Sequence, residues 1–131
     1  MTTGRIKALG EIALRVNDLD AMQAFYQNVI GLELMKRFTD SAFFKVADGY
    51  GGHTQILALF DRRASLDPQL STLDHLAFAI SREDFEAERA RLESLGCQLE
   101  LATHAWVNWR SLYVSDPEGN TVELVCYDPD V

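Results

Sequence analysis

The sequence predicts an α+β fold in which two βαβββ modules form one curved mixed β-sheet with helices on its outside. Three observations predict this fold: an internal repeat, a helix with its own stop signal in each half, and a tight turn near the C-terminus. The segment at 9–16 aligns without gaps with the segment at 73–80, apolar residue on apolar residue. Self-similarity at a fixed offset indicates a duplicated supersecondary unit.

The first half contains signals for one helix and four strands. Strand-like runs occur at 9–16, 32–35, 43–48 and 54–60, with β-branched, aromatic and other apolar residues. Asn17 or Asp18 can cap a helix, and Gly31 supplies a left-handed stop. Between these signals, apolar residues recur at helical spacing: Met22, Phe25, Tyr26, Val29 and Ile30.

The second half repeats this order. Ser81 followed by Asp84 resembles a capping box, and Gly96 ends the predicted helix. Phe85, Leu92 and Leu95 form its predicted buried stripe. The remaining strands are predicted at 97–101, 111–116 and 121–127, and Pro-Glu-Gly-Asn at 117–120 is typical of a hairpin turn.

The chain is predicted to be a single domain of paired modules spanning 1–131. The first module is expected at 5–62 and the second at 70–128, with a polar linker at 61–72. Because a half of about 60 residues is marginal on its own, the two halves are expected to share a core.

Composition excludes several classes of protein. The 131 residues carry a formal net charge of −8, which argues against a nucleic-acid partner because such binding depends on Lys and Arg. No apolar run reaches the ~18 residues that suggest a transmembrane helix, and no signal peptide is apparent. Cys97 and Cys126 are far apart, which fits free thiols in a reducing compartment. We therefore expect a cytoplasmic protein without a membrane partner.

Four polar residues interrupt apolar strands at related positions of the repeat. The first strand of each half offers one of them, Glu11 or His75, and the last strand offers Glu123. Aligning Asp48 with Asp116 places Gln55 opposite Glu123, whereas aligning Asp61 with Asp128 places Ile56 there. Each of the four also has an ordinary alternative role, as a solvated strand residue or a hydrogen-bonded core residue.

These four residues are the predicted metal ligands. Burying carboxylates and an imidazole costs several kcal/mol per unpaired ion, and a divalent cation would offset that cost. The mixed oxygen and nitrogen donors suit Zn, Ni, Co, Mn or Fe. Glu123 is the preferred carboxylate for proton transfer, and Glu11 is the alternative.

A second set of residues could line a pocket for a small-molecule substrate. It comprises His53, Trp106, Trp109, Arg110, Tyr113 and Tyr127. The tryptophans could instead close a loop onto the core, and Arg110 could pair with a surface carboxylate. His104 is expected to be solvated.

The chain resembles the vicinal oxygen chelate superfamily, which includes glyoxalase I, extradiol dioxygenases, fosfomycin-modifying enzymes and bleomycin-resistance proteins. Three segments carry the resemblance: the strand and helix from Glu11 to Leu34, the Leu-Asp-His-Leu-Ala-Phe run at 73–78, and the stretch at 111–125 that includes Asp-Pro-Glu-Gly-Asn. The resemblance implies paired modules around a divalent metal that chelates two adjacent substrate oxygens. It implies ligands at Glu11, His75 and Glu123, with Gln55 fourth. Glu11 departs from the family, which commonly has His there.

Three functions remain open at this stage. The leading hypothesis is a metal-dependent lyase or isomerase of the glyoxalase type. The second is an extradiol-type ring-cleaving dioxygenase, which Glu11 disfavours because that chemistry uses two His and one carboxylate. The third is a non-catalytic protein that binds a bleomycin-like drug. A homodimer is expected because an open sheet leaves edges that chains often cover by pairing.

Overall fold

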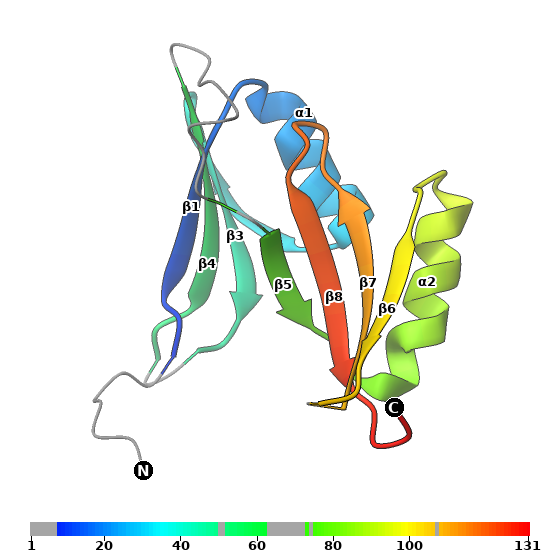
Figure 1. Cartoon of the computed structure of the whole chain (residues 1–131). Helices are drawn as coiled ribbons and strands as arrows, with labels where there is room; N and C mark the ends of the chain where they lie inside the picture. The colour runs from blue at the N-terminus through cyan, green and yellow to red at the C-terminus, as the bar shows by residue number, and fades with distance from the viewer. Residues whose placement is uncertain (1–7, 50–51, 63–72, 74, 107) are drawn as a thin grey trace. The chain divides into compact units, whose positions relative to one another are not determined.

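The structure is a computed structural model that describes residues 8–49, 52–62, 73, 75–106 and 108–131. The chain divides into two compact units, Met1–Ser65 and Leu66–Val131 (Figure 1). Most of the predicted linker at 61–72, together with the predicted module ends at 5–7 and 70–72, lies outside the described residues. No helix in the described ranges is both long enough and apolar enough to span a bilayer.

Each unit is one βαβββ module, which confirms the predicted α+β fold of paired modules. The strands form two four-stranded sheets, one in each module, where a single curved sheet was expected. The first contains β1 (Glu11–Val16), α1 (Leu19–Ala24), the π-helical segment η1 (Phe25–Ile30), β2 (Glu33–Arg37), β3 (Ser41–Ala47) and β4 (Gln55–Asp61). The second contains β5 (His75–Ala79), the 3₁₀ segment η3 (Arg82–Asp84), α2 (Phe85–Ser94), β6 (Glu100–His104), β7 (Trp109–Ser115) and β8 (Thr121–Tyr127). Each module forms a four-stranded mixed sheet in the order first, fourth, third, second strand.

The predicted caps explain where the first helix begins and ends. The Asp18 carboxylate accepts a hydrogen bond from the Ala21 amide at 3.0 Å, which satisfies a helix-end donor. Gly31 adopts a φ of 91° and ends the helical region. The uniform helical spacing did not predict the change to π-helical geometry, in which Tyr26 O accepts from Gly31 N.

The second helix differs from the prediction in how it begins and in which of its residues are buried. The Ser81 hydroxyl bonds the Asp84 carboxylate at 2.8 Å rather than a backbone amide, and a 3₁₀ turn precedes α2. Phe85 and Leu92 are buried, but Leu95 is 53% exposed, so its place in the buried stripe was wrong. Leu95 lies past the last turn of α2, at the helix C-cap.

The strand after α2 begins three residues later than predicted. The Cys97 amide bonds the Leu92 carbonyl and so belongs to the helix end. Strand β6 therefore starts at Glu100, which lies level with Tyr113 of β7.

Each module has its own buried apolar residues. In the first module, α1 packs against β3 and β4, and buried side chains include Met22, Tyr26, Phe44, Leu57 and Leu59. In the second, they include Phe85, Leu92, Leu112, Val122 and Leu124. The helical spacing predicts the buried helix residues, whereas the central strands are buried at consecutive positions, 57–59 in β4 and 122–124 in β8, rather than in alternation.

The turn between β7 and β8 fixes the register of the two strands that carry the candidate site. The Asp116 carboxylate accepts from the amides of Glu118 and Asn120, both at 2.9 Å, and from the Asn120 side chain at 2.8 Å. Gly119 occupies the left-handed region at a φ of 84°. The side chain of Asp116 thus accepts hydrogen bonds from turn amides that lie outside the ladder between β7 and β8.

We expect Asp116→Ala to lower the free energy of unfolding by about 2–3 kcal/mol, because it leaves turn donors around a buried position without their charged acceptor. Urea denaturation of both proteins measures this loss. Glu83→Ala, which removes an exposed carboxylate, is the control and should change stability by no more than about 0.5 kcal/mol. Equal stability of Asp116→Ala and wild type would contradict the assigned role.

Candidate functional site

One face of the second module's sheet gathers most of the predicted site residues. Glu123 of β8 lies level with Tyr113 of β7 on one side and with Ala77 of β5 on the other. Residues level with each other share a face, and alternate residues along a strand return to it. His75 and Ser111 therefore join them on what we call the Glu123 face.

The carboxylate of Glu123 is buried and held on both oxygens. Its side chain is 7% exposed. The hydroxyl of Ser111, which is fully buried, donates to Oε2 at 2.7 Å. The other oxygen, Oε1, lies 3.2 Å from Nε2 of His75, whose side chain is 40% exposed. The structure therefore brings together two of the four predicted ligands, one buried and one accessible to solvent.

The spacing of these two donors fits a shared metal ion. Neighbouring ligands on a divalent ion with bonds of about 2.1 Å lie roughly 3.0–3.4 Å apart, and Nε2 and Oε1 are 3.2 Å apart. The same contact serves equally well as a hydrogen-bonded pair. No cluster of three or more His, Cys, Asp or Glu side chains that could hold a metal occurs among the residues the structure describes. A metal at this pair would therefore need further ligands.

Tyr113 connects the pair to a second imidazole. Its hydroxyl lies 3.0 Å from Nε2 of His104, and its ring meets that of His75 edge to face with centroids 6.5 Å apart. Burial raises the pKa of Tyr113, and the charge of Glu123 raises it further. The phenol therefore stays protonated at neutral pH and can donate a hydrogen bond.

The first module places Glu11 and Gln55 differently from the sequence alignment. Glu11 begins β1, is exposed, and lies level with Ile56. Because Gln55 precedes Ile56, alternation points it to the opposite face from Glu11. The structure therefore does not bring Gln55 to the face of Glu11.

Strand pairing shows why the repeat misplaced Gln55. Lys45 lies level with Ile56 just as Tyr113 lies level with Glu123. Relative to the third strands, Ile56 therefore matches Glu123. Relative to the first strands, Ile56 lies level with Glu11 and so matches Thr121, which lies level with His75. Neither comparison places Gln55 at the position of Glu123. A register shift between Lys45 and Ala47 is present in the first module, whereas the matching strand pair in the second module runs without one.

His53 lies just before β4 and packs against the start of β1. A Cβ on Gly10 would lie 3.4 Å from Cε1 of His53. Gly49 approaches His53 so closely that a Cβ there would lie 2.0 Å from the His53 carbonyl oxygen, so only glycine fits. This close approach fixes the backbone that carries the imidazole.

Three predicted pocket aromatics are exposed at one end of the second sheet. Trp109 and Tyr127 lie level with each other on the Glu123 face, four residues along their strands from Tyr113 and Glu123 respectively. Trp109 is 44% exposed and Tyr127 62%, while Trp106 in the preceding turn is 87% exposed. None of these three side chains closes a loop onto the core.

Arg110 belongs to the opposite side of the sheet. Its guanidinium lies over the Phe85 ring, 4.4 Å from the centroid, and pairs with Glu86 of α2. The structure thus gives it a role in packing α2 and does not bring it to Glu123.

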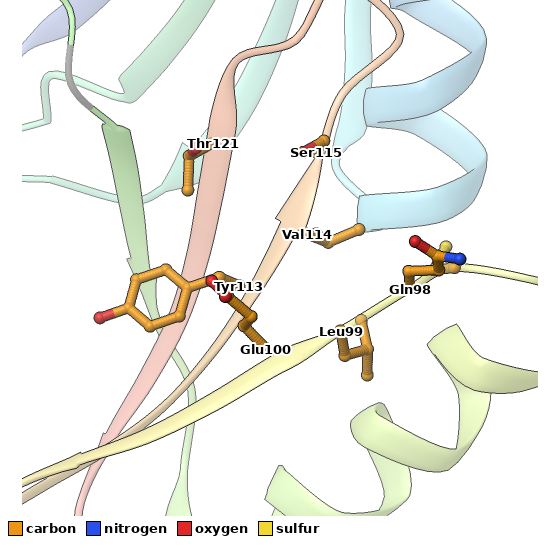
Figure 2. A pocket seen from close by; sticks show the side chains of 8 residues that line it. Gln98, Leu99, Glu100, Tyr113, Val114, Ser115 and Thr121 are labelled. Carbon is orange, nitrogen blue, oxygen red and sulfur yellow. The ribbon is translucent and has the colours of Figure 1, made fainter.

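A cleft of about 450 Å³ opens where the chain before β6 separates from β7. Figure 2 shows that the Tyr113 ring and the Val114 side chain leave β7 in opposite directions. The residues lining it are Cys97, Gln98, Leu99, Glu100, Tyr113, Val114, Ser115 and Thr121. Tyr113 therefore contributes both to this cleft and to the cluster around Glu123.

Sequence reasoning missed two residues of this cluster. Ser111 was seen only as the start of a strand, and His104 was expected to be solvated. The hairpin turn contained the signal for Ser111, because once Tyr113 is level with Glu123, Ser111 must share their face. For His104 the signal was weaker, since it required β6 to start later than its apolar residues suggest.

Comparison with known proteins shows similarity to two enzymes. It is 29% identical over 119 residues to the glutathione transferase FosA of Serratia marcescens, covering 91% of this chain and 80% of that protein. It is 30% identical to catechol-2,3-dioxygenase of Bacillus subtilis, covering 92% of this chain but only 42% of that protein.

Solved structures are also similar to this chain. Lactoylglutathione lyase from Agrobacterium tumefaciens matches with a TM-score of 0.69 at 30% identity, covering 94% of this chain and 96% of that one. A variant of the fosfomycin resistance protein FosX from Listeria monocytogenes, complexed with Mn(II) and 1S,2S-dihydroxypropylphosphonic acid, matches with a TM-score of 0.67 at 25% identity. That match covers 95% of this chain and 90% of that one.

The family model described as the Glyoxalase/Bleomycin resistance protein/Dioxygenase superfamily matches residues 8–124. This match spans both modules and includes Glu11, His75 and Glu123. The chain belongs to that superfamily.

Proposed function

We propose that this chain is a divalent-metal-dependent lyase or isomerase of the glyoxalase kind, acting on a small substrate with oxygens on neighbouring carbons. The observation that carries the proposal is the His75–Glu123 pair, whose donor atoms are separated as metal ligands are. FosX with Mn(II) and a dihydroxy phosphonic acid supports it, since that relative holds a metal and a compound with adjacent oxygens.

The proposed ligands are His75, Glu123 and Glu11. Glu11 is included because it holds the position in the first module that His75 holds in the second. Gln55 is left out because alternation turns it away from Glu11. When bound, the cation would supply Lewis-acid stabilisation for negative charge on the substrate oxygens.

The remaining roles are proton transfer, hydrogen bonding to the substrate and binding of its other groups. Glu123 has both carboxylate oxygens engaged, so Glu11, which is exposed, is the better proton acceptor. Glu11 takes the proton from the carbon that bears the substrate hydroxyl and returns it to the former carbonyl carbon. The hydroxyl proton passes to the former carbonyl oxygen, so the substrate is isomerised without net gain or loss of protons or electrons. Tyr113, kept protonated by its raised pKa, donates a hydrogen bond to a substrate oxygen. Trp109 and Tyr127 hold the rest of the substrate.

Charge favours an uncharged substrate over a phosphonate. By alternation, the described residues of the Glu123 face include the carboxylates Glu100 and Glu123 but no Lys or Arg. An anionic group placed there would meet repulsion from these carboxylates, and among the described residues of the face no Lys or Arg would assist the proposed metal ion in balancing its charge. This distinguishes the proposed substrate from the phosphonic acid in the FosX complex.

Two further features belong to the proposal. The protein works as a homodimer, because β6 and β2 end their sheets as unpaired edges. It works in the cytoplasm, because Cys97 and Cys126 are both free thiols, as a reducing compartment keeps them.

We expect the protein to bind one divalent ion per chain, measured by metal analysis and by calorimetric titration with Zn, Ni, Co and Mn. His75→Ala, Glu123→Gln and Glu11→Gln should each weaken binding by at least about 100-fold, beyond the 10–100-fold typical of outer-shell residues. His104→Ala, which removes an imidazole from the same sheet, is the control and should bind nearly as wild type. A wild-type protein that takes up no metal under any loading would refute the proposal.

Tyr113 gives a pH-dependent prediction for the metal-free protein. Because its folded pKa is raised, its contribution to stability is present below the ordinary tyrosine pKa of about 10 and is lost as pH rises through the folded value. Absorbance titration near 295 nm should show a late phase of tyrosine ionisation, and Tyr113→Phe should reduce the amplitude of that phase by one tyrosine. An unchanged titration curve in Tyr113→Phe would show that Tyr113 is not the perturbed phenol.

The similarity to catechol-2,3-dioxygenase supports a second candidate function, extradiol ring cleavage. Because Glu11 replaces a histidine of the usual two-His-one-carboxylate site, we expect protein loaded anaerobically with Fe(II) to consume no oxygen when catechol and air are added. An oxygen electrode measures this, and Glu11→His is the informative companion variant. Rapid oxygen uptake by the wild type would favour the dioxygenase over the isomerase.

A further inference from the structure

We propose that Ser111 is a positioning residue that aims the carboxylate of Glu123 at the metal position. Its hydroxyl donates to Oε2 at 2.7 Å, which leaves Oε1 as the oxygen directed toward Nε2 of His75. The proposal rests on the proposed function, because it assigns how one of the proposed ligands is held.

The contact is built from two buried groups. Ser111 has no exposed surface, and Glu123 as a whole residue is 5% exposed. A buried carboxylate oxygen without a donor costs several kcal/mol, so the hydroxyl and Oε2 are held together strongly. Ser111 therefore fixes one oxygen of the carboxylate, next to the Tyr113 hydroxyl, which also interacts with Glu123.

The strand register determines from which side Ser111 reaches the carboxylate of Glu123. Ser111 lies level with Val125, two residues along β8 from Glu123, so its hydroxyl reaches Oε2 diagonally across the strand pair. His75 lies level with Thr121, two residues from Glu123 in the other direction. The two partners thus approach the carboxylate from opposite ends and divide its oxygens between them.

Loss of the hydroxyl has a definite consequence. Oε2 would remain buried without Ser111 and would turn toward the hydroxyl of Tyr113, which already interacts with Glu123. Turning the carboxylate would move Oε1 away from Nε2 of His75. Metal affinity would fall although every proposed ligand is still present.

The test compares Mn(II) affinity with stability, by calorimetric titration at 25 °C and by thermal unfolding of the metal-free proteins. Ser111→Ala should bind Mn(II) about 10- to 100-fold more weakly than wild type, as expected when a residue behind a ligand is removed. Ser111→Thr keeps the hydroxyl and should recover most of the affinity. Ser115→Ala removes an exposed serine from the same strand and should leave binding unchanged.

The outcomes separate this inference from the function on which it rests. If wild type binds no Mn(II), nor any other divalent ion, the proposed function fails. If wild type binds and Ser111→Ala binds equally well, the function stands and the positioning role is overturned. Equal losses in Ser111→Ala and Ser111→Thr would assign the effect to packing and would also overturn it. Ser111→Cys, of similar size with a weak donor, serves as the substitute should Ser111→Ala fail to fold.

Discussion

The arrangement of the second module depends on a carboxylate that the fold removes from water. Glu123 sits in the middle of a strand whose neighbours Val122 and Leu124 are buried apolar residues. An ionised carboxylate at such a position is tolerated only when both oxygens have partners. Ser111 and His75 supply them, and because His75 is partly exposed, the pair meets solvent at its imidazole. The site is thus the accessible end of an otherwise buried polar contact.

The repeat also produces an asymmetry between the modules. Relative to the third strand, the position that holds Glu123 in the second module holds Ile56 in the first, and the first strand carries the carboxylate of Glu11 where the second module carries the imidazole of His75. Duplication followed by divergence has left one module with a paired carboxylate and imidazole and the other with an exposed carboxylate. An additional carboxylate in place of a histidine favours hard, Lewis-acidic cations over the softer iron chemistry of oxygenases.

Much of the fold could be predicted because its signals are local. Asp18, Gly31 and Gly119 each perform the capping or turn role that their residue type favours. Runs of β-branched, aromatic and other apolar residues identified the strands, and helical spacing identified the buried residues of the helices. The offset between halves relates His75 to Glu11, and Glu123 stands out as a charged residue inside an apolar strand. These features depend on neighbouring residues, so a single sequence contains them.

The errors concern contacts that join separate elements. Gln55 was misplaced because the register shift in β3 changes the pairing by one residue, and nothing in the sequence marks that shift. Arg110 was expected in the pocket because its strand face was not known, whereas the structure stacks it on Phe85. Ser111 was overlooked because serine is common in strands and gains meaning only opposite Glu123. Pairing between strands, rather than composition within them, decides these positions.

The sheet order has a consequence for how the chain is assembled during synthesis. The first strand of each module is an edge strand whose ladder partner is the last strand, so Glu11 must wait for Ile56 and His75 for Thr121 before either is paired. The antiparallel hairpins involve shorter loops and can form earlier. Each newly made half therefore presents an unpaired strand to its surroundings until its final residues leave the ribosome, and chaperone protection matters most during those two intervals.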